Sequence, residues 1–333
     1  MPSAVESDVA IEVTTEQPRD LRILGPVDEA ALTRSPPDAF VFARRKADIH
    51  AHVALYWSKT PLLDGRPTGF LGHFAARSLD AIEPLLSSAC EILRVRRVGI
   101  AIGPVNGNTW EKYRFVTWSD GSPSFFLEPE SPPEWPAAWE NAGFSVLARY
   151  NSTERRNLDE YAEYGQRHLP KLKARGVRVL GVTPDDFEVT LRRVYPLVRE
   201  AFARNFLYKP LELDEFLALY RPAAALVDPR FCRVVEMDGE IIAFVFAYVD
   251  PIERARTGRP GTVVVKTLAA RASMRTAFAG ALLAIEIDLA AKEIGAERVV
   301  NALMHESSRS LKMAARFGSV LRRYALYARA LSG

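Results

Sequence analysis

The stretch VKTLAARASMRTAFAGALL, residues 265–283, decides how this chain folds. It starts within a β-branched run, TVVVKTLAA (262–270), which predicts a buried strand. It continues into an apolar segment that predicts a helix from about Phe278 to Ile294, with Gly295 as the stop signal. The loop between them brings successive backbone N–H groups and a helix N-terminus to the end of the strand. This arrangement is typical of a site for an anion.

The flanking residues predict an alternating order of helices and strands. Upstream, Thr-Pro-Asp-Asp (183–186) is a helix start, and we expect one helix to about Asn205 and a second over Leu213–Tyr220. Asp238-Gly239 predicts a tight turn between two apolar strands. Downstream we expect a strand, a short helix and a final strand, at 298–306, at about 308–317 and at 320–331.

A weak internal duplication links the two halves of the chain. Ser-Val-Leu-x-Arg-Tyr occurs at 145–150 and at 319–324, and Ala-Ala-Arg occurs at 75–77 and at 269–271. The first half predicts strands at 39–47, 49–57, 68–76, 98–104 and 144–150, helices over about 79–94 and 135–142, and an insertion at 103–129. We therefore expect a flexible leader (1–24), an N-terminal domain (25–152), a polar connector (153–177) and a C-terminal domain (178–330).

In this order of elements, the second half resembles the GCN5-related N-acetyltransferase (GNAT) superfamily. The family's fourth strand ends in a loop of pattern Arg/Gln-x-x-Gly-x-Gly/Ala, and RTAFAG (275–280) lies in the matching register. The resemblance implies an α/β (α+β) fold of two tandem acyl-coenzyme A N-acyltransferase domains, with mixed central sheets flanked by helices. It also implies a coenzyme site formed by Leu268, Ala270, Arg275, Thr276, Ala277, Phe278, Ala279, Gly280, Ala281 and Ser307.

Several positions depart from the family pattern. Phe278 stands where the family has its first glycine, and a bulky side chain there is expected to obstruct a phosphate. Ala272 replaces a common proline. Ser307, Ser310 and Ala314 occupy the downstream motif, so the family's general-acid tyrosine is missing from its usual place. The first half lacks loop glycines, and we place no coenzyme there.

The insertion carries a candidate substrate site. Its segment GPVNGNTWEKYRF gathers polar and aromatic residues in a turn, which is also typical of plain loop scaffolding. The functional interpretation is a pocket between the halves, in which the guanidinium of Arg114 suits a carboxylate or phosphate. The predicted substrate-binding residues are Asn106, Trp110, Tyr113 and Arg114.

An acyl transfer to an amine needs a base for the amine proton and an acid for the leaving thiolate. The candidates at predicted strand ends are Tyr324, His305 and Glu236, with Glu306 and Tyr327 as further possibilities. His50 and His52 share a strand face and His73 follows nearby, but no Cys, Asp or Glu completes a ligand spacing, so we assign no metal.

Composition narrows the function classes. The 333 residues include 44 Lys plus Arg and 41 Asp plus Glu, a net charge of +3, which disfavours a salt-driven nucleic-acid binder. The longest apolar run, at 241–249, is too short to cross a bilayer, and the amino-terminal residues do not form a signal peptide. Cys90 and Cys232 are expected to be buried thiols, and we expect a cytoplasmic protein.

The resemblance thus implies an acyl-coenzyme A-dependent N-acyltransferase, with acetyl-coenzyme A or another acyl-coenzyme A as co-substrate. Its partner would be a small-molecule or peptide amine that attacks the thioester directly. No membrane partner is expected. Two alternatives stay open. One is an aminoacyl-tRNA-dependent transferase of the same fold, with tRNA as the nucleic-acid partner, for which the connector arginines, Lys171 and Lys173 offer a faint basic groove. The other is a non-catalytic binding protein, which Phe278, Ser307 and Ala314 favour.

Overall fold

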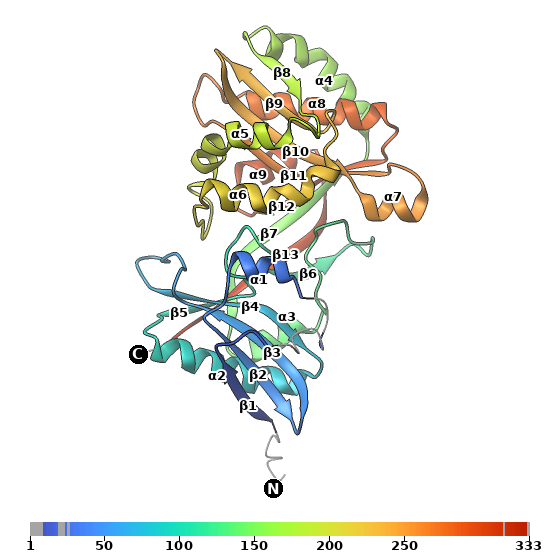
Figure 1. Ribbon diagram of the computed structural model, residues 1–333. Helices are drawn as coiled ribbons and strands as arrows, with labels where there is room; N and C mark the ends of the chain where they lie inside the picture. Colours follow the sequence, from blue (N-terminus) through green and yellow to red (C-terminus); the bar gives the residue numbers. More distant parts are fainter. Residues whose placement is uncertain (1–8, 19–23, 25–26, 316, 332–333) are drawn as a thin grey trace.

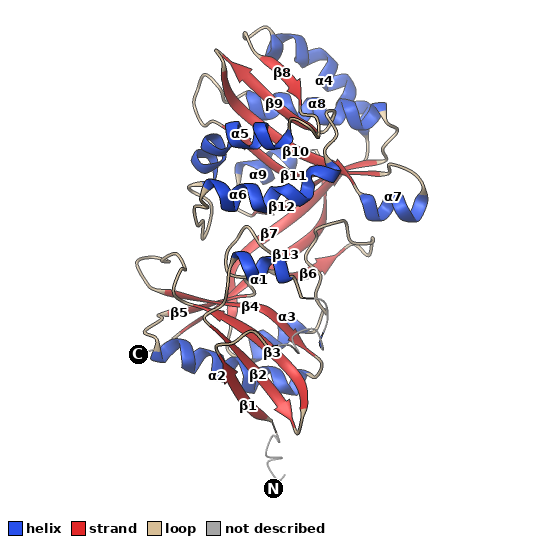
Figure 2. Cartoon of the chain, in the orientation of Figure 1, coloured by secondary structure: helices blue, strands red, loops and turns tan. Residues whose placement is uncertain are grey.

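The computed structural model describes residues 9–18, 24, 27–315 and 317–331 (Figure 1). These residues form one continuous sheet of thirteen strands, flanked by helices (Figure 2). The order across the sheet is β1 (Ala10–Thr14), β2 (Ala39–Arg45), β3 (Asp48–Tyr56), β4 (Thr68–Ala76), β5 (Ile100–Gly103), β13 (Ser319–Ala330), β7 (Ser145–Arg155), β12 (Arg298–His305), β11 (Thr262–Ala270), β10 (Glu240–Val249), β9 (Cys232–Met237) and β8 (Arg178–Gly181), with β6 (Phe115–Ser119) paired to β13 beside this path. The pairs β4–β5 and β11–β12 are parallel and the others are antiparallel, so the predicted mixed α/β class is confirmed.

Helices bury both faces of the sheet in the C-terminal half. Apolar side chains of α5 (Phe187–Phe202) and α6 (Leu213–Tyr220) pack on one face, and those of α8 (Ala279–Glu293), with α4 (Leu158–Lys173) beside it, pack on the other. This explains why β10 and β11 are apolar at nearly every position, as strands covered on both faces must be. The remaining helical elements are α1 (Glu29–Arg34), α2 (Ile82–Val95), α3 (Trp135–Asn141), α7 (Pro251–Thr257), α9 (Arg309–Ala314), η2 (Leu79–Ala81) and η3 (Arg221–Leu226).

Two long strands, β7 and β13, join the halves. β13 is the last strand of the chain, yet it lies between β5 and β7 and pairs with Ile100–Gly103 of the N-terminal half. β7, the last strand of the first half, pairs along its end with β12 of the second half. In Figure 1 these two strands run side by side between the upper and lower parts of the molecule. Each half therefore needs a strand from the other half to complete its sheet.

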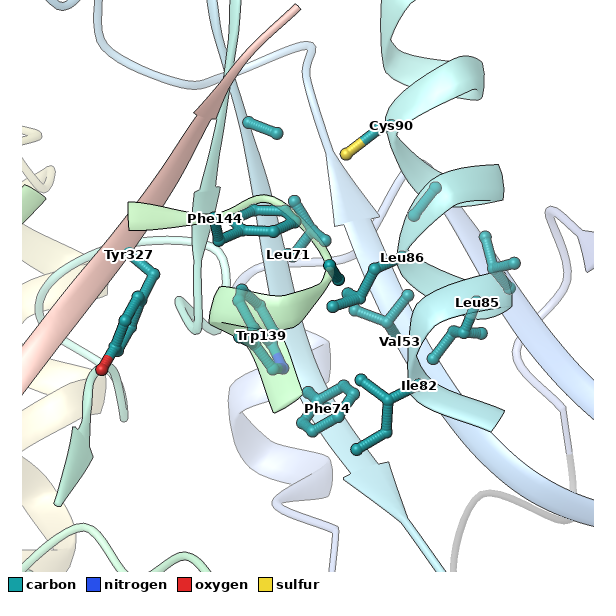
Figure 3. Close-up of a cluster of buried hydrophobic side chains, with 14 of the residues drawn as sticks. Val53, Leu71, Phe74, Ile82, Leu85, Leu86, Cys90, Trp139, Phe144 and Tyr327 are labelled. Atoms are coloured by element: carbon teal, nitrogen blue, oxygen red, sulfur yellow. The ribbon is translucent and has the colours of Figure 1, made fainter. Parts of the chain in front are cut away.

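The N-terminal core shows what β13 contributes. Trp139 of α3 is fully buried and meets Phe74 of β4 edge-on, with ring centres 5.2 Å apart. The ring of Tyr327, from β13, packs in the same cluster, and its hydroxyl donates to Glu140 at 3.2 Å (Figure 3). Burial raises the pKa of Tyr327 to about 12. The terminal strand thus supplies both backbone pairing and an aromatic side chain to the first half.

Several elements differ from the sequence prediction. Residues 10–14, inside the expected flexible leader, form β1 on β2, because alternating AIEVT suits an edge strand, while residues 1–8 and 19–23 lie outside the described residues. The expected connector, 153–177, is the end of β7 followed by α4, whose apolar side covers α8. The boundaries at 152 and 178 stay predictions, and the sheet crosses both of them.

The exchange of β13 predicts how a fragment behaves. Residues 1–157 expressed alone should fail to unfold cooperatively on heating, because β5 and β7 lose the strand between them and the Trp139 cluster loses Tyr327. Circular dichroism at 220 nm, compared with the full chain, measures this. A sharp thermal transition in the fragment would contradict the proposed dependence on β13.

Candidate functional site

The parallel pair β11–β12 opens towards the ends of its strands. Pairing runs from Thr262 with Arg298 to Val265 with Asn301 and stops there, although both strands continue. β11 bulges at this point, since Val265 and Thr267 pair with consecutive residues of β10 and leave Lys266 without a partner. We call residues 266–270 of β11 and 302–305 of β12, beyond the last pair, the β11–β12 opening.

The N-terminus of α8 lies at this opening. In the described part of the chain, the backbone N–H groups of Gly280 and Ala281 have no hydrogen-bond acceptor, and the first turn contains no acidic side chain. The loop before the helix is held by Thr276, whose hydroxyl donates to the carbonyl oxygen of Arg271 at 2.8 Å. Free N–H groups at the positive end of a 15-residue helix form an environment that suits a phosphate.

Phe278 does not obstruct this helix end as the sequence predicted. Its ring is buried in the apolar cluster beneath α8, and the guanidinium carbon of Arg175 lies 4.7 Å from the ring centre. The expectation was wrong because it assumed a side chain pointing into the loop, whereas the end of the unpredicted helix α4 provides a cover for the ring. At Gly280 an added Cβ would meet the Cβ of Ala270 at 3.6 Å, an ordinary contact.

The other predicted coenzyme residues lie around the same opening. Ser307 follows β12, and its hydroxyl bonds to Nδ1 of His305 at 2.8 Å. Arg275 is exposed and pairs with Asp238 in the β9–β10 turn at 2.6 Å. The remaining predicted residues are at the end of β11 or the start of α8: Leu268, Ala270, Thr276, Ala277, Ala279, Gly280 and Ala281.

Arg114 reaches this opening from the N-terminal half. Its guanidinium carbon lies 3.5 Å from the ring centre of Tyr113 and 3.9 Å from that of Tyr150, so the cation contacts two aromatic rings, whose planes are 86° apart. Its Nη1 donates to the carbonyl oxygen of Leu303 on β12 at 3.2 Å. The structure thus places Arg114 against β12 of the second half. The predicted role of Tyr113 and Arg114 in substrate binding stays a prediction.

Trp110 also contacts the second half. Its indole Nε1 donates to the carbonyl oxygen of Lys209 at 2.9 Å, and its ring meets Phe202, Tyr208 and Phe216. It borders a small pocket between the halves, together with Arg34, Asn108, Glu111 and residues of α6 and the loop before it. Most of the ring surface serves packing between the halves.

Asn106 has a different role from the predicted one. β4 bulges at His73 as β11 does at Lys266, and the side-chain oxygen of Asn106 accepts the His73 N–H at 2.7 Å. A Cβ on Gly72 would overlap the carbonyl oxygen of Val105, so the loop lies directly against the strand. Asn106 therefore closes the equivalent opening of the N-terminal half instead of lining a pocket with Arg114.

The predicted catalytic residues are not gathered in one place. Tyr324 is buried, and its hydroxyl contacts Glu128 and, at 3.0 Å, Ser152. Glu236 lies on β9, three strands from β12 and so about 14 Å away. Its two carboxylate oxygens pair with Arg178 and Arg193, each at 2.6 Å, and these partners lower its pKa.

His305 is the predicted catalytic residue that lies at the opening. Its ring meets Tyr150 edge-on, with ring centres 4.9 Å apart, and also contacts Phe206. Burial lowers the pKa of His305, and Arg114 lowers it further against the opposing effect of Glu306. The imidazole is therefore mostly neutral at pH 7 and able to accept a proton.

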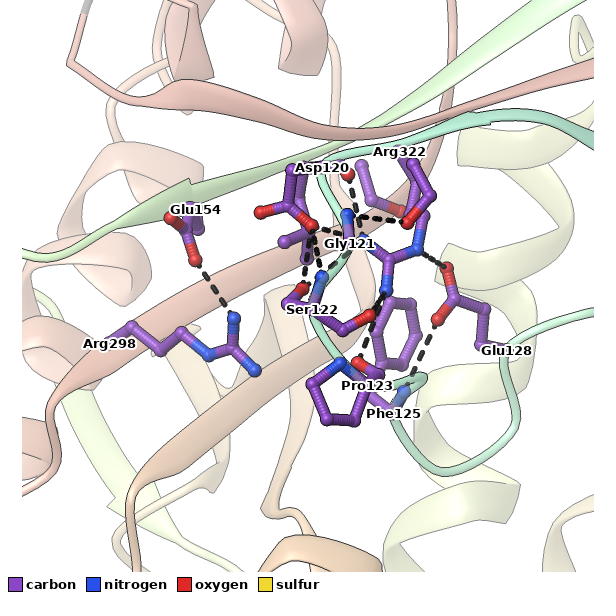
Figure 4. Close-up of polar contacts among 12 residues, drawn as sticks. Asp120, Gly121, Ser122, Pro123, Phe125, Glu128, Glu154, Arg298 and Arg322 are labelled. Carbon is purple, nitrogen blue, oxygen red and sulfur yellow. Dashed lines mark hydrogen bonds and ion pairs between the residues drawn. The ribbon is translucent and has the colours of Figure 1, made fainter.

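Neither Lys266 nor the hydrogen-bond network of Arg322 was predicted from the sequence. Lys266 is partly exposed, and burial lowers its pKa to about 8, with Arg114 and Lys112 adding to the effect. A lysine within a β-branched strand was the signal that could have identified it. Arg322 of β13 binds Asp120, Glu128 and carbonyl oxygens of the 120–128 loop, and thereby fixes the carboxylate next to Tyr324 (Figure 4).

Solved structures share this architecture. The chain superposes on a GCN5-related glucosamine N-acetyltransferase region of a fungal multi-domain β-N-acetylglucosaminidase, with a TM-score of 0.56, 15% identity, and coverage of 96% of this chain and 38% of that one. It also superposes on a GCN5-related N-acetyltransferase from Sphaerobacter thermophilus, with a TM-score of 0.52, 12% identity, and coverage of 97% of this chain and 96% of that one. A third match is a tandem GNAT protein from the clavulanic acid biosynthesis pathway, with a TM-score of 0.51, 14% identity, and coverage of 97% of this chain and 99% of that one. No family model and no curated protein matches the sequence. At these identities the likeness shows the fold, which is that of the GCN5-related N-acetyltransferases, as predicted.

Among the described residues, no helix combines the length and the apolar character needed to span a membrane. The same residues contain no group of three or more His, Cys, Asp or Glu side chains placed to hold a metal ion.

The position of Tyr324 predicts a structural role for its hydroxyl. Tyr324→Phe should lower the free energy of unfolding by about 1.5–3 kcal/mol, because Glu128 loses a buried donor. Urea denaturation measures the loss, with Tyr327→Phe as the matched control, since that hydroxyl makes one longer bond, to the exposed Glu140. Equal stability of Tyr324→Phe and the native protein would contradict the network.

Proposed function

We propose that this protein is an acyl-coenzyme A-dependent N-acyltransferase, with the coenzyme at the β11–β12 opening and an amine acceptor between the halves. The observation that carries the proposal is the bulged, diverging β11–β12 pair with unpaired N–H groups of α8 at its end. The acetyltransferases that share the fold support the same class of reaction.

The residues at the opening fit the coenzyme phosphates. The N–H groups of Gly280 and Ala281 would donate to them, and Arg275, exposed beside the loop, would add positive charge. Phe278 leaves the loop clear because its ring is buried. Bound there, the coenzyme supplies a thioester whose acyl group can pass to an amine.

The chain's own contribution is positioning and proton transfer. β11 and β12 would hold donor and acceptor in fixed orientation, which lowers the barrier without a covalent enzyme intermediate. His305, neutral and held by Ser307, would accept the amine proton at Nδ1, the ring nitrogen that accepts the Ser307 N–H in this structure. Tyr324 and Glu236 are engaged by neighbouring side chains, and we assign them no step.

The helix end provides the direct test of coenzyme binding. Gly280→Trp should abolish binding of acetyl-coenzyme A in calorimetric titration, because the indole covers the N–H groups of the first turn. Gly280→Ala should bind as the native protein does, since its Cβ meets only Ala270 at van der Waals distance. Thermal melting of both variants checks that the fold is kept. Undiminished affinity in Gly280→Trp would refute this location, and binding without turnover on any amine would favour a non-catalytic binding protein.

A pH profile tests His305. Because the folded pKa lies below the ordinary value of 6.5, the decline of kcat at acid pH that reports this imidazole should have its midpoint below pH 6.5. His305→Gln should lower kcat by about 100-fold or more and remove that decline. His50→Gln, at a histidine bonded to Ser78 in the N-terminal half, is the matched control and should leave both unchanged. An unaltered profile in His305→Gln would exclude His305 as the base.

A further inference from the structure

We propose that the amine acceptor also carries a carboxylate, and that Arg114 of the N-terminal half and Lys266 of the C-terminal half bind it together. This inference rests on the proposed function for the identity of the acceptor. The binding site itself rests on the geometry and charge of the two side chains.

Arg114 differs from the other buried arginines in the described residues. Those three each pair with a buried or half-buried carboxylate: Arg155 with Asp288, Arg298 with Glu154, and Arg322 with Asp120 and Glu128. Arg114 is only 5% exposed, yet no carboxylate of the described chain lies within ion-pair distance of it. A buried cation without a counter-charge is costly, which points to an anion from a ligand.

The hydrogen bonds of Arg114 leave one edge of the guanidinium unused. Nη1 donates to Leu303, whereas Nε is buried without any acceptor and Nη2 has none among the described residues. The rings of Tyr113 and Tyr150 both lie against the guanidinium, with their planes 86° apart, and so restrict the directions from which a ligand can approach it. The Nε–Nη2 edge presents two parallel donors, which match the two oxygens of a carboxylate.

Lys266 is a second cation without a partner at the same place. It occupies the β11 bulge, where it has no pairing partner on β10, and it makes no ion pair with any described residue. The positive charges of Arg114 and Lys112 repel that of Lys266 and so lower the pKa of Lys266. Glu128, which contacts Tyr324, is engaged by Arg322, so it does not neutralise them. An anion between Arg114 and Lys266 would relieve their repulsion.

The location identifies the substrate class. Leu303, which holds Arg114, is on β12 of the opening, and Lys266 is on the facing strand β11. A carboxylate fixed by both would keep the rest of a small molecule beside the proposed acyl site, within the region of His305. The acceptor would therefore be an amino acid or a related amino carboxylate.

Anion titration of the full-length protein tests the site without coenzyme. Sodium acetate should raise Tm by about 2–4 °C over sodium chloride at equal ionic strength, and Arg114→Gln and Lys266→Met should each abolish the rise. Lys266→Met keeps the side-chain length and removes repulsion, so it should melt no lower than the native protein. Arg323→Gln, at an exposed arginine over the Trp118 ring, is the matched control and should keep the rise.

Two results of this titration would overturn the proposal. One is an acetate effect that is absent or equal in all four proteins. The other is stabilisation by inorganic phosphate alone that depends on Arg114 and Lys266, which would assign the site to a phosphate instead. Failure to bind acetyl-coenzyme A would refute the proposed function and leave this titration valid.

Acyl transfer tests the substrate class. With acetyl-coenzyme A as donor, amino acids should exceed their own carboxamides in kcat/KM by at least about tenfold. Arg114→Gln should reduce that ratio to below about threefold, mainly by raising KM for the amino acids, since it removes binding and not proton transfer. A ratio unchanged by Arg114→Gln, or a preference for carboxamides in the native protein, would overturn the assignment.

Discussion

The ladder between β7 and β13 is the constraint on which the rest of the structure depends. It extends from Ser145 with Ala328 to Glu154 with Ser319, and so runs through both halves. On one side β13 completes the N-terminal sheet through β5, and on the other β7 completes the C-terminal sheet through β12. Because an unpaired central strand would leave many buried N–H and C=O groups without partners, neither half has a closed hydrogen-bond pattern without the other. The relative placement of the halves follows from backbone pairing more than from side-chain contact.

This ladder also determines which charges are balanced. Arg322 on β13 is nearly inaccessible, and the 120–128 loop folds around it to provide Asp120, Glu128 and two carbonyl oxygens. Glu128 in turn engages the hydroxyl of Tyr324, so that a tyrosine in the middle of β13 becomes part of this network. Within reach of the same strands, Arg114 has aromatic faces and one carbonyl oxygen but no acid. Arg322 is thus a buried cation with counter-charges, whereas Arg114 is a buried cation without one among the described residues.

Local pattern predicted most of the elements but not their long-range partners. The β-branched run at 262–270, the following helix and the final strand were predicted from their own residues, and so was the GNAT resemblance. The exchange of β13 could not be predicted, because a largely apolar, buried strand suits either half equally well. The same limit explains the error at Phe278, whose direction depends on Arg175 at the end of α4, and the assignment of Tyr324, whose hydroxyl depends on Glu128 in the insertion. Residues near in space and distant in sequence decided each of these cases.

One loop contacts both the opening of the N-terminal half and the β11–β12 opening. Residues 104–114 start beside β4. There the backbone of Val105 fills the space next to Gly72, and the side-chain oxygen of Asn106 accepts the N–H group of His73 at the bulge. The same loop then crosses to the other half, where Trp110 packs near α6 and Arg114 reaches β12. The contacts with β4 thus fix the start of the loop. Because the start of the loop is fixed, Arg114 at its end reaches the second opening at a defined position. In the proposed enzyme, the N-terminal half would therefore position Arg114 on the acceptor side of the β11–β12 opening.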